Sequence, residues 1–162
     1  MLINRAYYTS TIHFFLKQSS NAILGELSKN HRHDLVQLQT NAWLKQIEIL
    51  KEQLNTFANS ENNTIFFEFG IPRMGKRADV VLVINGLVFV IEFKVGAREY
   101  ARHNKEQAID YALDLKHFHQ GSHKACIVPV LLATDALTMH SEISINHDGL
   151  VSLLCVNRRI SR

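Results

Sequence analysis

The first third of the chain carries the hydrophobic spacing of amphipathic helices. From Asp34 to Phe57, apolar residues recur at steps of three and four, with charged residues between them and neither Gly nor Pro. A shorter helix is predicted from Ile12 to Leu27, with Gly25 weakening its end. Both helices are expected to pack on one face of a sheet. The apolar positions of the longer helix are Val36, Trp43, Ile47, Leu50 and Leu54.

From residue 64 onward the pattern changes to that of β-strands. Thr64–Phe69 is rich in β-branched and aromatic residues, which predicts one strand. The apolar runs Ala78–Ile84 and Leu87–Val95 are separated only by Asn85-Gly86, and both positions of such a tight turn need positive φ. The pattern therefore predicts a β-hairpin with a two-residue turn.

One more helix and two more strands complete the pattern. An apolar stripe at helical spacing predicts a helix over residues 103–119, which ends before Gly121. The largely continuous apolar run Ala125–Thr134 predicts a strand that is buried on both faces and paired in parallel. The last strand is predicted at Gly149–Val156.

Composition supports one ordered domain. The 162 residues are 46% hydrophobic and 20% charged, with seven Gly and two Pro, so a normal core can form without disulfides. We expect one α/β domain over residues 1–162, in which a helical part (1–58) precedes a mixed sheet (64–156) flanked by helices. Cys126 and Cys155 lie in apolar runs and are expected to be free, buried residues in a reducing compartment.

The chain has no segment typical of a membrane or secreted protein. Its longest apolar run, Ala125–Ala133, has nine residues, whereas a membrane helix needs ~20. The N-terminus lacks a basic segment followed by an apolar stretch and a cleavage site. We therefore expect a cytoplasmic protein without a membrane partner.

The formal net charge of +3 is unevenly distributed. Residues 73–105 hold seven basic and three acidic residues, whereas the remainder holds eleven basic and twelve acidic ones. A local positive excess of this kind suits a polyanion such as nucleic acid.

The predicted hairpin places charged residues opposite one another. With Asn85 and Gly86 as turn residues, Asp79 stands opposite Glu92, and Lys94 shares their face because alternate side chains point to the same side. Directly opposed like charges are destabilising, so a hard cation such as Mg²⁺ is expected to compensate them and to acidify a bound water. The alternative is a charged cluster at a strand end, which contributes little to stability.

The same residues resemble a known nuclease signature. Residues 77–79 (RAD), residues 92–94 (EFK) and the following helix with Gln107 are similar to the PD-(D/E)XK nuclease superfamily. The departure is Ala78, where the superfamily name has Pro. The resemblance implies a restriction-endonuclease-like core.

The resemblance also implies roles for individual residues. Asp79, Glu92 and the backbone carbonyl of Phe93 would bind Mg²⁺, for which Mn²⁺ can substitute. Lys94 would be the catalytic lysine, and Gln107 would contact the site.

A closer resemblance covers most of the chain. The chain is similar to the N-terminal nuclease-like region of bacterial proteins that carry a C-terminal superfamily-one DNA/RNA helicase. This similarity implies a helicase portion or a helicase partner. The chain has no G-x-x-x-x-G-K-[ST] phosphate loop, so ATP hydrolysis is not expected of it. The strings that carry the resemblance are NAWLKQIEILKEQL, FEFGIPRMGKRADVVL, VFVIEFKVG, QAIDYALDLKHFH and IVPVLLAT.

A third acid often completes such sites. Glu68 matches a recurrent acid of the helicase-linked group and is preferred, either as a metal ligand or as a partner of Arg77. Glu26, in the predicted first helix, is the next candidate, and Glu48 is expected to be a surface charge.

Five basic residues could surround the site and contact phosphates without reading sequence. They are Arg73, Lys76, Arg77, Arg98 and Arg102.

The histidines do not indicate zinc. His117 and His119 cannot share one helix face, and structural zinc sites usually combine His with closely spaced Cys pairs.

The leading hypothesis is a Mg²⁺-dependent nuclease that hydrolyses nucleic acid, with DNA favoured, through a metal-activated water. The alternatives are an inactive nucleic-acid-binding or regulatory module and an interaction domain of a helicase; related nucleases also suggest a homodimer.

Overall fold

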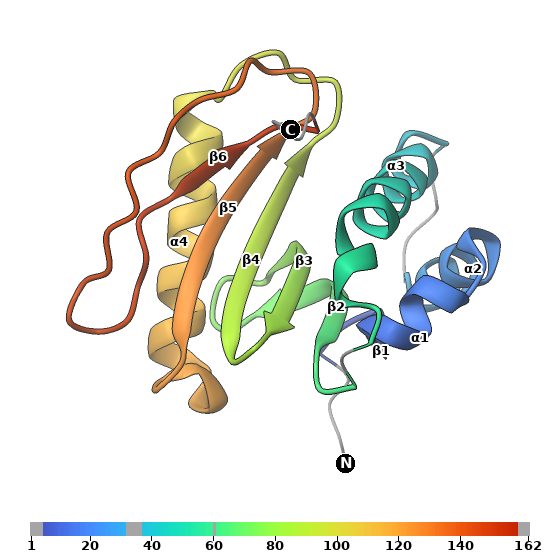
Figure 1. Cartoon of the computed structure of the whole chain (residues 1–162), viewed down its shortest axis with the longest axis horizontal. Coiled ribbons are helices and arrows are strands. Elements are labelled where there is room, and N and C mark those ends of the chain that lie inside the picture. The colour runs from blue at the N-terminus through green and yellow to red at the C-terminus, as the bar shows by residue number, and fades with distance from the viewer. Residues whose placement is uncertain (1–4, 32–36, 60, 159–162) are drawn as a thin grey trace.

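A six-stranded mixed sheet forms the centre of the computed structural model, which describes residues 5–31, 37–59 and 61–158 (Figure 1). The spatial order of the strands is their order in the chain. The first four strands pair antiparallel, and the last two continue the sheet in parallel, as predicted for the run at 125–134. The strands are β1 (Tyr8–Thr11), β2 (Thr64–Ile71), β3 (Lys76–Ile84), β4 (Leu87–Lys94), β5 (Cys126–Ala133) and β6 (Leu154–Val156).

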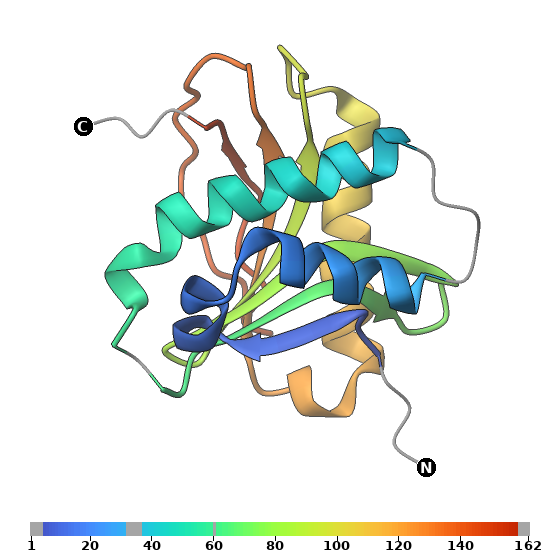
Figure 2. The same cartoon turned by 90° about the vertical axis from the view of Figure 1, so that its right-hand side faces the viewer.

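Helices cover both faces of this sheet, which confirms the expected α/β class. Figures 1 and 2 show the helices of residues 12–54 on one face and the long helix of residues 102–118 on the other. None of the helices in the described residues is both long and apolar enough to cross a membrane. The first face carries α1 (Ile12–Lys17), α2 (Ser20–Asn30) and α3 (Gln37–Leu54), and the second carries α4 (Arg102–Phe118); short 3₁₀ turns η1 (Asn55–Phe57) and η2 (Gln120–Ser122) follow α3 and α4.

The single helix predicted over Ile12–Leu27 is wrong, because the chain breaks it into α1 and α2. The Ser19 side chain accepts a hydrogen bond from the Ala22 N–H and begins a second helix. The Lys51 ammonium, from α3, donates to carbonyls at the end of α1, including that of Gln18. Capping at the break therefore outweighs the continuous apolar pattern.

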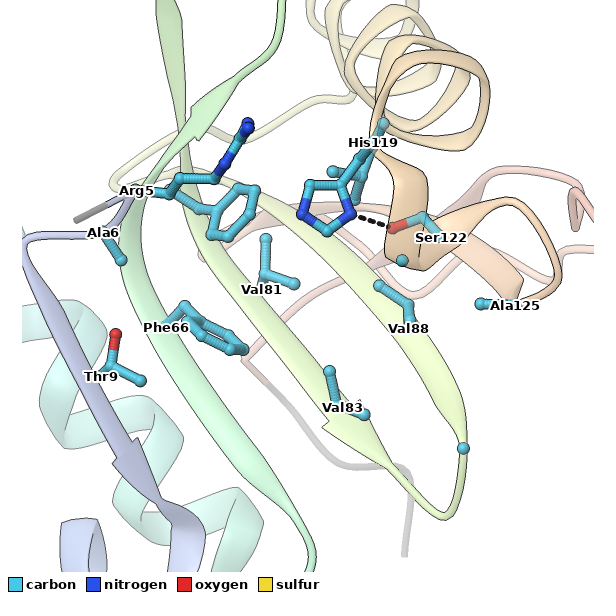
Figure 3. A pocket seen from close by; sticks show the side chains of 14 residues that line it. Arg5, Ala6, Thr9, Phe66, Val81, Val83, Val88, His119, Ser122 and Ala125 are labelled. Carbon is cyan, nitrogen blue, oxygen red and sulfur yellow. Dashed lines mark hydrogen bonds between the residues drawn. The ribbon is translucent and has the colours of Figure 1, made fainter. Parts of the chain in front are cut away.

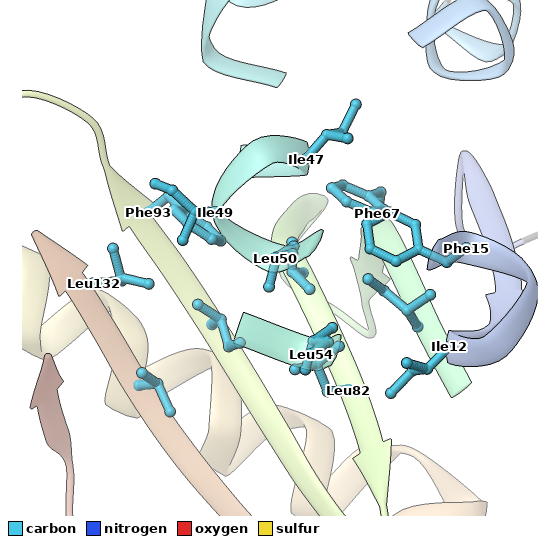
Figure 4. Close-up of a cluster of buried hydrophobic side chains, with 14 of the residues drawn as sticks. Ile12, Phe15, Ile47, Ile49, Leu50, Leu54, Phe67, Leu82, Phe93 and Leu132 are labelled. Carbon is cyan, nitrogen blue, oxygen red and sulfur yellow. The ribbon is translucent and has the colours of Figure 1, made fainter. Parts of the chain in front are cut away.

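The helix predicted from Asp34 to Phe57 corresponds to α3 and η1, and residues 32–36 lie outside the described part of the chain. Its predicted apolar positions from Trp43 onward are buried. Figure 4 shows α3 side chains packed against α1 and the sheet. This core includes Ile47, Ile49, Leu50 and Leu54 of α3, Ile12 and Phe15 of α1, and Phe67, Leu82, Phe93 and Leu132 of the sheet.

The predicted hairpin is confirmed with its register. Ile84 pairs with Leu87 and Val80 with Ile91, and both Asn85 (φ 51°) and Gly86 (φ 81°) adopt positive φ. The valines that share a face with the charged residues pack under α4, as expected for an apolar face. They contact Tyr111, Ala112 and Leu115 of that helix.

The two edges of the sheet differ from the sequence prediction. β1 has only four residues and was not predicted, because its pairing with β2 rather than its own apolar pattern defines it. The strand predicted at Gly149–Val156 is shortened to Leu154–Val156, with isolated bridges at Leu150 and Val151. Both cysteines are free, as expected, although Cys126 is only half-buried.

Candidate active site

Asp79 and Glu92 lie close together on β3 and β4, one position beyond Val80↔Ile91, the last pair of the hairpin ladder. The Asp79 N–H donates to Glu92 Oε1 at 3.2 Å, and the Phe93 N–H donates to Asp79 Oδ2 at 2.8 Å. Glu92 is 3% exposed. The hairpin thus brings two carboxyl groups together at its open end, as the register predicted.

This environment disfavours full ionisation of the pair. Burial raises the pKa of Asp79 to about 7, against the opposing effect of the Phe93 N–H bond. Burial, followed by the proximity of Asp79, raises the pKa of Glu92 to about 9. Near neutral pH the two groups therefore retain at least one proton unless a positive charge compensates them.

Lys94 and Gln107 meet beside the carboxyl pair. Lys94 Nζ donates to Gln107 Oε1 at 3.4 Å, and Gln107 Nε2 donates to the Tyr111 hydroxyl at 2.9 Å. Gln107 and Tyr111 lie one turn apart on α4. The helix therefore fixes the amide that faces the lysine.

Glu68 marks a local irregularity in β2. Its φ of 53° interrupts the pairing with β3, which is otherwise in one register from Thr64↔Val83 to Ile71↔Lys76. Arg77 Nη1 donates to the Glu68 carbonyl at 2.6 Å, and Trp43 Nε1 donates to its carboxylate at 3.0 Å. Burial raises the pKa of Glu68. Its negative charge also raises the pKa values of Asp79 and Glu92, although its side chain is held by α3.

The other candidate acids do not reach the pair. Glu26 is exposed on α2 and is not among the residues that line the site. Glu48 is an exposed α3 residue that pairs with Lys45 at 3.7 Å, as expected of a surface charge.

An open cleft of about 660 Å³ contains the carboxyl pair and Lys94. It lies where α3 and α4, which cover opposite faces, both approach the end of β4. The loop after Lys94 is held by a bond from the Gly96 N–H to Thr134 Oγ1 at 2.7 Å. The cleft is lined by Gln39, Ala42 and Gln46 of α3, Arg77 and Asp79 of β3, Glu92, Phe93 and Lys94 of β4, Val95–Ala97, and Asn104 and Gln107 of α4.

Gln46 is the site residue that sequence analysis missed most clearly. It is 4% exposed, and its Oε1 has no hydrogen-bond partner among the described residues. The sequence offered one signal for Gln46, which is an amide placed between the apolar positions of the predicted helix. Such an amide is expected to be buried, and buried polar groups usually need a partner. Gln39 and Asn104, also missed, are ordinary polar residues of helices in the sequence and gave no such signal.

The five basic residues occupy different places. Arg77 lines the cleft, and its guanidinium Cζ lies 4.1 Å from the ring centroid of Tyr7, which is not a cleft residue. Arg98 follows the loop Val95–Ala97 and is exposed. Arg102 begins α4 and pairs with Glu106 at 2.9 Å. Lys76 lines a small pocket beside the first turns of α4. Arg73 stacks on Phe118 at the other end of that helix, with its Cζ 4.2 Å from the ring centroid, and so lies away from the cleft.

The donor set of the cleft fits a hard cation. Two carboxylates, the Phe93 carbonyl and the unpartnered Gln46 amide oxygen are oxygen ligands of the kind that Mg²⁺ takes. Within the described residues no three Asp, Glu, His or Cys side chains gather closely enough to hold a metal ion. Any cation here would therefore rely on two acids with neutral oxygens and water.

A second cavity, of about 520 Å³, has a different character (Figure 3). Valines 81, 83 and 88 form its apolar floor, and His119 Nδ1 is hydrogen-bonded to Ser122 Oγ at 3.0 Å. Among the described residues that line it, none carries a carboxylate. The cavity therefore lacks the carboxylate oxygens that a hard cation such as Mg²⁺ prefers.

Comparison with protein-family models, curated proteins and solved structures gave no significant match.

Proposed function

We propose that this protein is a metal-dependent nuclease of the PD-(D/E)XK type that hydrolyses phosphodiester bonds in nucleic acid, with DNA as the favoured substrate. The observation that carries the proposal is the close pair Asp79 and Glu92, with raised pKa values, in one cleft with Lys94. Placing two acids in such a position destabilises the fold. A catalytic cation gives a reason for this arrangement that a structural role does not.

The chain's own oxygens would hold the cation. Asp79 and Glu92 supply the negative charge, and the Phe93 carbonyl and Gln46 amide supply neutral oxygens from two elements. When bound, Mg²⁺ or Mn²⁺ supplies Lewis-acid stabilisation of phosphoryl oxygens and a more acidic water.

Lys94 is suited to act directly on the reaction. Its ammonium can orient the attacking water and stabilise the negative charge that develops on the phosphoryl oxygens. Gln107 accepts one of its N–H groups and is itself positioned by Tyr111, which leaves the other N–H donors for substrate and water. In the reaction the water oxygen bonds to phosphorus, the bond to the leaving oxygen breaks, and that oxygen takes a proton.

Nucleic acid would be held mainly through its phosphates. Arg98 and Arg102 flank the cleft loop and the start of α4, and Arg77 lies in the cleft. Contacts of this type position a backbone without reading base sequence.

The test is cleavage of labelled single- and double-stranded DNA and RNA with Mg²⁺, Mn²⁺ or EDTA. Asp79→Asn and Lys94→Met are expected to lower the cleavage rate by at least ~100-fold, because electrostatic and positioning groups typically contribute that much. Asp110→Asn, an exposed acid on α4 outside the cleft, is the matched control and keeps the wild-type rate.

Two results would contradict the proposal. Cleavage that persists in Asp79→Asn would indicate a contaminating nuclease or another site. A wild-type protein that binds nucleic acid but cuts none of these substrates with either cation would favour the inactive binding module instead.

A further inference from the structure

The second cavity lies on the face of the sheet that α4 covers. In the described part of the chain α4 is the only long helix on this face, and its Leu115 forms part of the cavity wall. Beyond Leu115 the cavity opens over β2, β3 and β4, with β1 on one side and η2 on the other (Figure 3). Its volume of about 520 Å³ is in the range of small-molecule binding sites.

The floor of the second cavity is apolar and elongated. Val81 and Val83 contribute from β3, and Val88 contributes from β4 (Figure 3). Because Val81, Val83 and the turn residue Gly86 follow one another along the hairpin, the floor extends for about 15 Å at ~3.3 Å per residue. Val83 and the neighbouring Phe66 are only half-buried, which leaves apolar surface uncovered. A floor of this shape suits an extended hydrocarbon chain.

One end of the second cavity carries a positive charge. Arg5 lines the cavity and is exposed, and its guanidinium has no hydrogen bond or ion pair within the described residues. Figure 3 shows Arg5 and His119 at the same end of the row of valines. None of the described residues that line the cavity carries a carboxylate. An anionic group at this end would therefore meet a cation that has no competing partner.

His119 supplies a second donor at this end. Its Nδ1 lies 3.0 Å from the Ser122 hydroxyl oxygen, and its ring is edge-on to that of Phe69, with centroids 5.8 Å apart. Burial, followed by the charges of Arg5 and His123, lowers the pKa of His119, so the ring is neutral near pH 7. Because the buried Ser122 hydroxyl has Nδ1 as its acceptor, the ring hydrogen is on Nε2. Within the described residues Nε2 has no partner of its own, and it lies on the side of the ring that faces Arg5 (Figure 3).

We propose that the second cavity binds a medium-chain fatty acid, with its carboxylate between Arg5 and His119 and its acyl chain along the valine floor. The guanidinium would pair with the carboxylate, and His119 Nε2–H would donate a second hydrogen bond to it. An uncharged occupant, such as an apolar segment of another protein, would leave both donors unused. None of these cavity residues lines the nuclease cleft.

The first test is isothermal titration calorimetry of the full chain with decanoate and with the uncharged decanol, both below the concentrations at which they aggregate. One decanoate is expected to bind per chain, roughly tenfold more tightly than decanol. Arg5→Gln should remove most of this difference. Lys17→Gln is the matched control, because it removes an exposed charge from α1 on the opposite face, and it should preserve the difference. Absence of decanoate binding, or equal affinities of the wild type for the two ligands, overturns the proposal.

The second test locates the ligand. In ¹³C-methyl NMR spectra, decanoate should shift the signals of Val81, Val83 and Val88 but not those of Val128, which belongs to the core on the other face. Val83→Phe places a ring in the empty space above the floor and should abolish decanoate binding. Shifts confined to other methyl groups, or an unchanged affinity of this variant, would exclude the site. Asp79→Asn should bind decanoate as the wild type does, so the fatty-acid site and the nuclease are tested separately.

Discussion

Asp79 and Glu92 make the stability of the metal-free protein depend on pH. Their pKa values of about 7 and about 9 in the folded chain exceed the ordinary values of Asp and Glu, so the folded state binds more protons than the unfolded state. The free energy of unfolding should therefore fall by several kcal/mol as pH rises from about 5 to about 9. Urea unfolding in EDTA at several pH values measures this.

The isosteric variant Glu92→Gln isolates the cause of this pH dependence. Because the amide of this variant does not ionise, the free energy of unfolding of the variant should decrease much less than that of the wild type over the same pH range. Asp110→Asn, which removes an exposed acid, should retain the wild-type slope. Added Mg²⁺ should stabilise the wild type more at pH 8 than at pH 6, since a cation favours the ionised pair. Equal slopes in wild type and Glu92→Gln would contradict this account.

Gln46 provides a separate measure of the cation site. Its buried oxygen, which has no hydrogen-bond partner in the described part of the chain, lowers the stability of the protein when no cation is bound. Gln46→Leu should leave the free energy of unfolding unchanged or raise it by about 1 kcal/mol, and should weaken Mn²⁺ binding in isothermal titration calorimetry. Gln46→Glu, which keeps the oxygen and adds charge, should strengthen it. Unchanged Mn²⁺ affinity in both variants would remove Gln46 from the site.

These residues show how far sequence could predict the site. The two-residue turn determines the cross-strand register, so the proximity of Asp79 and Glu92, one position beyond the last ladder pair, was predictable by counting. The placement of Gln46 depends on how α3 crosses the sheet, which hydrophobic spacing does not specify. Likewise, nothing local predicts positive φ at Glu68, because that conformation is held by Arg77 and Trp43 from distant elements.

Helices and strands were predictable where one pattern persisted over many residues. The long helices α3 and α4 and the hairpin were located to within a few residues. The break between α1 and α2 was not, because it depends on the Lys51 ammonium, which reaches carbonyls more than thirty positions away. β1 was missed for the same reason, since its partner β2 lies far along the chain.

Lys51 therefore offers a test of how the N-terminal helices are held together. Its ammonium satisfies the carbonyls of Phe15 and Leu16 at 2.9 and 3.4 Å. Lys51→Met keeps most of the side-chain volume but leaves these acceptors without the charge, and should lower the free energy of unfolding by about 1–3 kcal/mol. Lys45→Met, which loses only a surface ion pair, should change it by less than about 0.5 kcal/mol. Chemical denaturation of both variants measures the two changes in the free energy of unfolding, and equal losses in the two variants would contradict this role of Lys51.

The whole architecture explains why the cleft lies where it does. Helices on opposite faces of a sheet are normally separated by its full thickness. Here the hairpin ends at Lys94, and both α3 and the start of α4 reach past this end. The cleft is therefore lined by the acids of the sheet, by the Gln46 amide of α3 and by the Gln107 amide of α4.

The same architecture predicts which basic residues bind nucleic acid. Arg98 and Arg102 lie at the cleft end of α4, whereas Arg73 is stacked on Phe118 at the opposite end. Each phosphate contact that is lost reduces the slope of log K against log salt by about 1. In fluorescence anisotropy with labelled DNA and Ca²⁺ in place of Mg²⁺, Arg98→Ala and Arg102→Ala should weaken binding and reduce this slope, for every sequence tried.

Arg73→Ala is the matched control because it removes the same charge from the same molecule. Long-range attraction alone would make all three variants equivalent, since each lowers the net charge equally. Direct phosphate contact instead predicts that Arg73→Ala keeps the wild-type salt slope, because its guanidinium already packs on an aromatic ring away from the cleft. Equal slopes for the three variants would mean that the charge excess attracts nucleic acid without a defined path across the cleft, which would weaken the case for cleavage there.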